Sequence, residues 1–350
     1  MVQPDRIHTH ISSSRINLPV GTRSVTVIGA GIAGAWQALL LARAGFDVTV
    51  HERDSDAMAQ AASHWAGGML APYCEAEASE PLITRLGERS LTLWREHLPD
   101  ETRCEGSLVV AHARDRADYE RFARMAPEHT RLDAAGIEAV EPSLDGRFRE
   151  ALFFPDEGHV EPRKVLPALH AGIRAAGGRI AFESEQAADQ ADGIVIDCRG
   201  LAARDALPDL RGVKGEEIIV ETDEITLARP VRLMHPRWPL YVIPRDGNRF
   251  MIGATSIERE DDGVTVRSAL ELLSAAYAVH PAFAEARIVE IGSGLRPAFP
   301  DNMPRITIEG SRIAVNGLYR HGFLLAPALA ELTLNYLTRG ALDNVVMRCA

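Results

Sequence analysis

The fold of this chain is decided by the stretch Val25-Thr26-Val27-Ile28-Gly29-Ala30-Gly31-Ile32-Ala33-Gly34. A short apolar run leads into three glycines, and residues 35–44 then have the spacing of a helix that ends at Gly45. The next apolar run, residues 48–50, predicts a second strand. Together these segments predict a β-α-β unit of about 30 residues.

The glycine turn of this unit predicts a dinucleotide site. Glycines leave backbone amides open to a pyrophosphate, and the N-terminus of the helix adds a partial positive charge. Seventeen residues separate Gly34 from Glu52, whose carboxylate can accept hydrogen bonds from both ribose hydroxyls. A turn that serves only helix-strand packing is the alternative, and the pattern fits FAD and NAD equally. The residues expected to contact the dinucleotide in this unit are Gly29, Gly31, Ile32, Ala33, Gly34, Glu52 and Arg53.

Composition restricts the class of partner. The chain has 350 residues, 46% of them hydrophobic, and its net charge of −11 repels nucleic-acid backbones and anionic membranes. Residues 1–23 have no apolar segment of a secretory signal, and no run of about 18 apolar residues predicts a membrane helix. The four cysteines form no C-x-x-C pair, and no His, Asp or Glu cluster has metal-ligand spacing. We therefore predict a cytoplasmic protein that binds a small molecule and no metal, with residues 1–23 as a flexible arm.

Strand-rich segments interrupt the α/β pattern. Helices are predicted over 81–97 and 162–176, and a buried strand is predicted over 193–197. Antiparallel strands are predicted farther on, separated by turns such as Asp246-Gly247, over residues 217–222, 240–243, 249–252 and 289–292. This order favours two interleaved domains.

Four segments carry a resemblance to a known family. The loop Ala62-Ser63-His64-Trp65-Ala66-Gly67-Gly68-Met69-Leu70-Ala71-Pro72 resembles the flavin-side loop of the FAD-dependent D-amino-acid oxidase superfamily, and of its glycine oxidase branch in particular. Residues 240–245 with 252–255 are similar to that branch's substrate-domain strand pair. Residues 294–297 resemble its arginine-bearing turn, and residues 317–327 resemble its closing motif. The resemblance covers residues 24–345, although the loop alone would also fit a plain surface loop.

The resemblance implies an α/β plus α+β fold, in which a Rossmann-like FAD-binding domain is interleaved with an antiparallel-sheet substrate domain. We expect the FAD-binding domain to comprise residues 24–87, 150–214 and 288–350, and the substrate domain to comprise residues 88–149 and 215–287. FAD is expected to bind without a covalent link. Further contacts with FAD are expected from the flavin-side loop and the closing motif, namely from Ala62, Ser63, Gly67, Gly68, Met69, Leu318, Tyr319, Arg320, His321, Gly322, Phe323 and Leu324.

The resemblance also places a substrate clamp. Arg296 is expected to grip the substrate carboxylate, because a guanidinium binds a carboxylate through two parallel hydrogen bonds and stays charged. Tyr241 and Arg320 are expected to bind the substrate beside it. The alternatives are a surface arginine, a half-buried strand tyrosine and a helix-capping arginine. No acid or base catalyst is expected when the flavin accepts a hydride. A histidine beside such a motif more often orients backbone or faces outward than acts as a base, and this is the expectation for His321.

The predicted enzyme is an FAD-dependent amine oxidoreductase of the glycine oxidase type. It would convert glycine or a small amino acid into an imine, with dioxygen giving hydrogen peroxide, and the imine would feed the thiazole half of thiamine. A D-amino-acid or sarcosine oxidase, a related dehydrogenase and a non-catalytic flavin-binding subunit are the alternatives.

Side chains near Met69, Met234 and Met251 are expected to limit substrate size. The branch implies a homo-oligomer, such as a tetramer. Two departures from the family are Asp197-Cys198-Arg199-Gly200, in place of small residues before a glycine, and the acidic turn Gly215-Glu216-Glu217.

Overall fold

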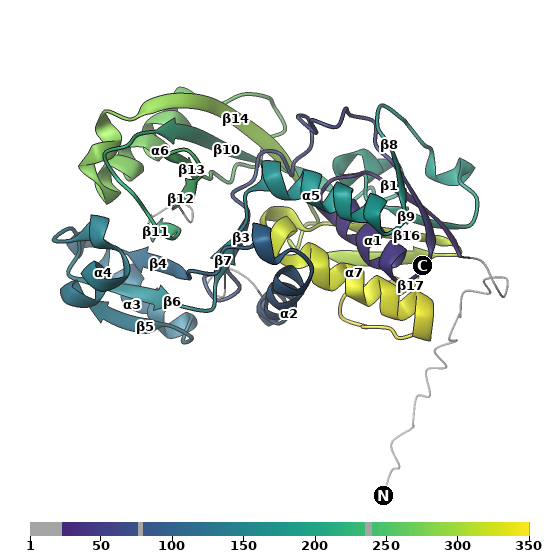
Figure 1. Cartoon of the computed structure of the whole chain (residues 1–350), viewed down its shortest axis with the longest axis horizontal. Coiled ribbons are helices and arrows are strands. Elements are labelled where there is room, and N and C mark those ends of the chain that lie inside the picture. Colours follow the sequence, from purple (N-terminus) through teal and green to yellow (C-terminus); the bar gives the residue numbers. More distant parts are fainter. Residues whose placement is uncertain (1–22, 76–79, 235–239, 350) are drawn as a thin grey trace, which may run out of the picture.

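Two lobes, each built on its own sheet, lie side by side in the computed structural model, which describes residues 23–75, 80–234 and 240–349 (Figure 1). The first lobe has the parallel pairing of a dinucleotide-binding fold, and the second is mostly antiparallel. The predicted α/β plus α+β class is confirmed. The predicted arm, apart from Arg23, lies outside the described residues.

The sheet of the first lobe has seven strands in the order β17-β15-β16-β9-β1-β2-β8. β1 lies inside this sheet and pairs in parallel with β2 and β9, and among the strands of described residues here only β15 and β16 pair antiparallel. The strands are β1 (Ser24–Ile28), β2 (Asp47–His51), β8 (Arg179–Ala181), β9 (Ile194–Asp197), β15 (Arg305–Glu309), β16 (Arg312–Asn316) and β17 (Met347–Cys349). Val25 and Val27 of β1 are fully buried, because helices pack against the sheet.

Four helices pack in this lobe: α1 (Ile32–Arg43), α2 (Pro81–His97), α5 (Pro162–Ala175) and α7 (Gly322–Arg339). α1 is buried on almost all sides, since α5 and α7 both contact it. Trp36 of α1 meets Trp94 of α2 edge to face, with ring centroids 4.8 Å apart. This pair is fully buried and fixes α2 in the core of the lobe. The predicted helices over 81–97 and 162–176 are therefore confirmed.

The sheet of the second lobe has eight strands in the order β14-β10-β13-β12-β11-β4-β6-β5. Its strands are β4 (Ser107–Val110), β5 (Thr130–Asp133), β6 (Glu150–Phe154), β10 (Arg211–Glu221), β11 (Val231–Leu233), β12 (Leu240–Arg245), β13 (Arg249–Gly253) and β14 (Arg287–Ala298). Helices α3 (Arg116–Met125), α4 (Ala134–Val140) and α6 (Val266–Val279) belong to this lobe (Figure 1). A short pair, β3 (Met69–Leu70) with β7 (Gly158–His159), lies near the junction.

Four sequence-based expectations differ from the structure. Residues 88–97 were expected in the substrate domain, but they belong to α2, which packs in the first lobe. β14 was expected to begin the last FAD-binding segment, but it pairs with β10 along its length, from Arg211 opposite Ala298 to Glu221 opposite Arg287. β6, expected in the segment 150–214, pairs with β4 and β5 of the second lobe. The segment 215–217 is not a turn, because it lies inside β10 with neighbours on both sides. Strand pairing joins segments far apart in the sequence, so local patterns did not show these assignments.

Candidate active site

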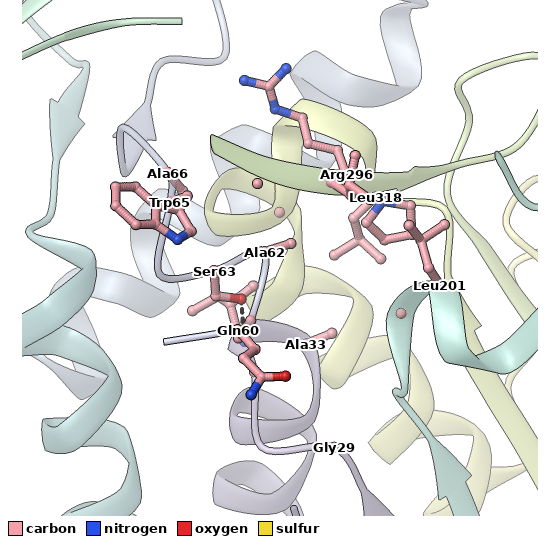
Figure 2. Close-up of a pocket in the computed structure, with 18 of the residues that line it drawn as sticks. Gly29, Ala33, Gln60, Ala62, Ser63, Trp65, Ala66, Leu201, Arg296 and Leu318 are labelled. Carbon is pink, nitrogen blue, oxygen red and sulfur yellow. Dashed lines mark hydrogen bonds between the residues drawn. The ribbon is translucent and has the colours of Figure 1, made fainter. Parts of the chain in front are cut away.

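A cavity of about 1100 Å³ is lined by residues of both lobes. Its volume is above the roughly 300–1,000 Å³ of a site for a drug-sized ligand, so it has room for a dinucleotide and a small second molecule. Gly29 and Ala33 lie at one end of the cavity and Arg296 lies at the other (Figure 2). We refer to these as the nucleotide end and the substrate end.

At the nucleotide end, the three glycines of the turn have different roles. Gly29 has a φ of +97°, and a Cβ there would lie 2.6 Å from the carbonyl oxygen of Cys198. A Cβ on Gly34 would lie 1.9 Å from the carbonyl oxygen of Gly29. Gly29 and Gly31 line the cavity but Gly34 does not. Gly34, which was expected to contact the dinucleotide, lies outside the cavity lining, and its hydrogen side chain allows the turn and the helix to pack.

Glu52 stands at the end of β2 with its side chain in the cavity wall. It is 8% exposed, and its carboxylate accepts hydrogen bonds from the backbone amides of Ala30, at 2.7 Å, and Asp54, at 3.0 Å. These bonds fix the carboxylate beside the glycine turn and leave lone pairs that can accept from ribose hydroxyls.

Ser63, which was expected to contact FAD, lies at the N-terminus of α1 and lines the cavity. Its hydroxyl accepts a hydrogen bond of 3.0 Å from the amide of Ile32 (Figure 2). The first turn of α1 has no acidic residue, so its positive end remains suited to an anionic group. The loop that contains Ser63 therefore connects the nucleotide end to the substrate end.

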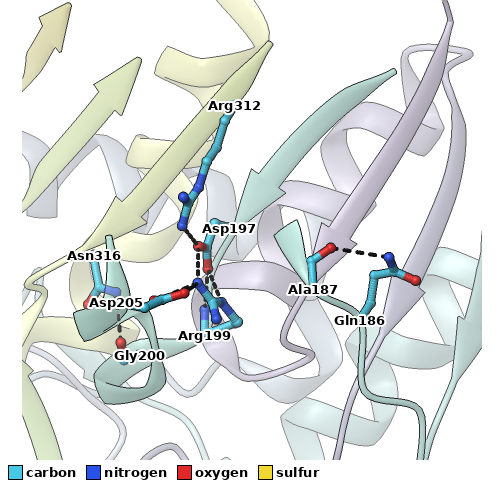
Figure 3. Close-up of polar contacts among 8 residues, drawn as sticks. All are labelled: Gln186, Ala187, Asp197, Arg199, Gly200, Asp205, Arg312 and Asn316. Carbon is cyan, nitrogen blue, oxygen red and sulfur yellow. Dashed lines mark hydrogen bonds and ion pairs between the residues drawn. The ribbon is translucent and has the colours of Figure 1, made fainter. Parts of the chain in front are cut away.

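The unusual segment Asp197-Cys198-Arg199-Gly200 forms a charge-compensated cluster at the nucleotide end (Figure 3). Asp197 is fully buried, and both Arg199 and Arg312 form ion pairs with it. Burial alone would raise the pKa of Asp197, but hydrogen bonds from the two guanidiniums outweigh burial and lower it. Arg199 also pairs with Asp205 at 2.9 Å. The cluster thus ties the end of β9 to β16 while Arg199 lines the cavity.

The substrate end is one face of the second sheet. Tyr241 and Ile243 of β12 lie opposite Gly253 and Met251 of β13, and these four residues line the cavity. Met69 also lines it and packs against the same apolar cluster. Met234 does not line the cavity, because it packs in another cluster with residues such as Phe122.

Arg296 crosses this face from β14. A Cβ on Gly215 of β10 would lie 2.0 Å from Nη2 of Arg296, so the missing side chain leaves the space that the guanidinium occupies. Nη1 donates a 2.9 Å hydrogen bond to the carbonyl oxygen of Thr255. Within residues 23–75, 80–234 and 240–349, no carboxylate forms an ion pair with Arg296. Arg296 was expected in a turn, but its segment is a strand at the edge of the sheet, where Pro297 is tolerated.

Tyr241 lies in the same wall. It is 6% exposed, and its hydroxyl oxygen has no hydrogen-bond partner among the described residues. Burial raises the pKa of the Tyr241 phenol well above its ordinary value, so the hydroxyl remains a donor. A buried donor of this kind costs free energy until a ligand satisfies it. Tyr241 is therefore suited to donate to a bound anion.

Arg320 differs from Arg296, because it already has an anionic partner. Its Nη2 lies 2.5 Å from Oε2 of Glu75, and Nε2 of His321 lies 2.9 Å from the same oxygen. Burial alone would raise the pKa of Glu75, but Arg320 and His321 outweigh burial and lower it. Glu75 lines the cavity and was missed, since nothing in its sequence context indicates this partnership. The charge of Arg320 is thus balanced inside the site.

Most of the residues expected to contact the cofactor or substrate meet at this one cavity. Those that line it are Gly29, Gly31, Ile32, Ala33, Glu52, Arg53, Ala62, Ser63, Gly67, Gly68, Met69, Tyr241, Arg296, Leu318, Tyr319, Arg320, Gly322 and Phe323. Those outside its lining are Gly34, His321 and Leu324. Leu324 packs in the core and His321 contacts Glu75, so both support the wall from behind.

One cavity thus brings together a glycine turn suited to a dinucleotide and a wall that carries Tyr241 and Arg296, as expected for a cofactor-dependent enzyme. The model of the family described as FAD dependent oxidoreductase, DAO, matches residues 24–335, so the chain belongs to that family. FAD is its cofactor, and the glycine turn, Glu52 and the size of the cavity fit this group.

Two relatives refine the comparison. The chain is 52% identical over 307 residues to a Rhizobium etli protein named as a thiamine biosynthesis oxidoreductase, ThiO, covering 87% of this chain and 94% of that protein. It is 28% identical to the glycine oxidase of Geobacillus kaustophilus, covering 90% and 93% of the two chains. The crystal structure of glycine oxidase from Geobacillus kaustophilus superposes with a TM-score of 0.77 over 90% of this chain and 94% of that one. The protein is thus an FAD-dependent oxidoreductase similar to ThiO and glycine oxidases.

None of the helices formed by described residues is long and apolar enough to cross a membrane. In that same part of the chain, no three His, Cys, Asp or Glu side chains come together as a metal site.

Proposed function

We propose that the enzyme oxidises glycine or another small α-amino acid to the imine and passes the electrons to dioxygen, giving hydrogen peroxide. The observation that carries this proposal is the guanidinium of Arg296, which faces the cavity without a carboxylate partner among the described residues. A substrate carboxylate is the group that such a guanidinium binds best. The hydroxyl of Tyr241, which has no hydrogen-bond partner among the described residues, can donate to the same carboxylate.

The residues of the substrate end would position the amino acid rather than exchange protons with it. Arg296 and Tyr241 would hold the carboxylate, which fixes the direction of the adjoining Cα–H bond. FAD, when bound, supplies the acceptor for the hydride that leaves Cα. Ile243 and Met251 form an apolar wall beside Tyr241, which favours a small side chain and limits water around the reacting carbon.

The names of the relatives support a biosynthetic role. We propose that the imine serves the synthesis of the thiazole half of thiamine, as the name of the Rhizobium etli relative suggests for that protein. A D-amino-acid or sarcosine oxidase remains the alternative within the family. We also propose that the enzyme is a homo-oligomer, such as a tetramer, which light scattering of the purified protein would test.

Anaerobic addition of glycine to the purified, FAD-loaded protein tests the proposed function. We expect the visible absorption of the flavin to bleach, and admission of air to restore it with release of hydrogen peroxide. Rates with glycine, sarcosine, D-alanine and D-proline would then rank the substrates. A flavin that bleaches with none of these amino acids, or a protein that binds no FAD, would contradict the proposal.

A further inference from the structure

Arg296 is held by the loop that follows β13, which connects this strand to α6 and spans residues 254–265. Thr255, the second residue of this loop, is fully buried, and its carbonyl oxygen accepts the 2.9 Å hydrogen bond from Nη1 of Arg296. Within the described part of the chain, this is the hydrogen bond that fixes the guanidinium. The position of Arg296 therefore depends on how firmly Thr255 is held.

Glu216 of β10 holds Thr255 through three hydrogen bonds. The backbone amide of Glu216 donates to Oγ1 of Thr255 at 2.9 Å, and the amide of Thr255 donates back to the carbonyl oxygen of Glu216 at 3.1 Å. Oγ1 of Thr255 in turn donates to Oε2 of Glu216 at 3.2 Å. Thr255 and Glu216 are both fully buried. If the side chain of one residue is removed, the hydrogen-bonding groups of the other lose partners that water cannot replace.

The same carboxylate fastens the far end of the loop. Oε1 of Glu216 accepts from the amide of Thr265 at 3.2 Å and lies 3.1 Å from Nζ of Lys214. Lys214 is 1% exposed, and its ammonium also lies 3.1 Å from Oδ1 of Asp261 in the loop. Because a buried ammonium is costly unless it is paired, these contacts restrain the loop at Asp261 and Thr265.

Successive side chains of β10 point to opposite faces of the sheet, so this strand can both fasten the loop and make room for the Arg296 guanidinium. Lys214 and Glu216 share the face of the strand that fastens the loop, and Gly215 between them lies under the guanidinium of Arg296. Leu295 and Gly294 of β14 lie opposite Lys214 and Gly215. One short segment of β10 therefore provides the space for the guanidinium and the anchor for the carbonyl that fixes it.

We propose that Thr255 and Glu216 are positioning residues for substrate binding, which act by holding the Arg296 guanidinium where the substrate carboxylate meets it. This inference rests on the proposed function. The acid at position 216 is thus needed for the substrate clamp, although it touches neither the cavity nor the substrate itself.

The test measures how tightly the FAD-loaded protein binds acetate, a non-reacting carboxylate. Binding is detected through the change in flavin absorption as acetate is added. Thr255→Val removes the hydroxyl at constant shape, and we expect acetate affinity to fall about tenfold. Thr255→Ser keeps the hydroxyl, so its affinity for acetate should lie within about twofold of the wild-type affinity. Glu216→Gln changes the other partner of the hydrogen bond, so its affinity for acetate should fall. Only protein that has bound FAD contributes to the absorption change. A variant that folds poorly therefore gives a smaller absorption change, but the acetate concentration at the midpoint can still be measured.

Two references separate the possible outcomes. Thr333→Val removes a fully buried hydroxyl that bonds to the carbonyl oxygen of Leu329 in α7, away from the cavity, and should leave the midpoint unchanged. Arg296→Met should abolish the acetate effect. If Thr255→Val binds acetate like the wild type while Arg296→Met does not, the positioning role is wrong and the proposed function stands. If the wild type shows no acetate effect, or Arg296→Met retains it, both proposals fail.

Discussion

The two ends of the cavity are built in different ways. At the nucleotide end, Gly29 and Gly31 lie within a few residues of one another, and Glu52 follows on the next strand of the sheet. At the substrate end, Tyr241, Gly215 and Arg296 lie on three strands that are brought together by pairing over long stretches of sequence. A cofactor site can thus be encoded by a local motif, whereas the substrate clamp depends on strand register.

The largest expected effect tests the substrate end. Arg296→Met should lower kcat/KM for glycine by a factor that corresponds to roughly 2–5 kcal/mol of transition-state binding, because a buried charge partner is lost. FAD binding should persist, since the nucleotide end is separate. Steady-state kinetics and flavin absorption of the same preparation would measure both.

Arg287→Met is the matched control for this variant. Arg287 lies on the same strand, but it is exposed and pairs with Glu221 at 2.7 Å. Its loss should change kcat/KM by less than about 0.5 kcal/mol, because exposed ion pairs contribute little. If kcat/KM fell equally in the two variants, the loss would come from disturbing the strand β14 and not from removing the Arg296 guanidinium.

The next effect tests the nucleotide end. Gly34→Ala should destabilise the protein by about 3 kcal/mol and weaken FAD binding, since its Cβ would lie 1.9 Å from the carbonyl oxygen of Gly29. Gly310→Ala is the matched control, because Gly310 has a φ of +56° but open space around it. It should cost about 1 kcal/mol, the typical cost of a left-handed backbone for alanine. Urea unfolding and FAD titration would compare the two, and equal costs would exclude the packing explanation.

Glu52→Gln should weaken FAD binding by roughly 2 kcal/mol, and it should also lower the free energy of unfolding of the apoprotein by about 1–3 kcal/mol, because the new NH2 group faces a backbone amide that donated to a carboxylate oxygen. The amide keeps the shape of the carboxylate but loses the charge that accepts from backbone amides and from ribose hydroxyls. FAD titration of the apoprotein checks this. An affinity equal to that of the wild type would remove Glu52 from the cofactor site.

The smallest effect concerns Glu217, which is 3% exposed on β10. Burial raises its pKa to about 7. The folded protein then binds this proton more tightly than the unfolded chain does, so stability falls as pH rises from about 4.5 to 7 and is level above that. Glu217→Gln should be more stable than the wild type at pH 8, and the gain should vanish near pH 4. Unfolding experiments across this range check the sign, and a gain that grows toward low pH would contradict it. Burial also raises the pKa of Glu157 to about 7. The free energy of unfolding of Glu217→Gln should therefore still fall with rising pH, but less steeply than that of the wild type.

These comparisons explain what the sequence could predict. The turn after β1, the helices α2 and α5 and the carboxylate of Glu52 follow from local patterns that neighbouring residues enforce. Arg296 was expected from a resemblance, but its partners Gly215 and Thr255 depend on the register of β10 with β14 and β13. Glu75 could not be predicted, because its role depends on Arg320, which is far away in the sequence.

The central claim is that one cavity places an FAD ring system beside a carboxylate held by Arg296. A crystal structure of the protein with FAD and acetate tests it most directly. We predict both acetate oxygens within about 3 Å of the Arg296 guanidinium, with the ring system in the same cavity. Acetate bound elsewhere, or Arg296 turned into bulk water while FAD occupies the cavity, would contradict the account.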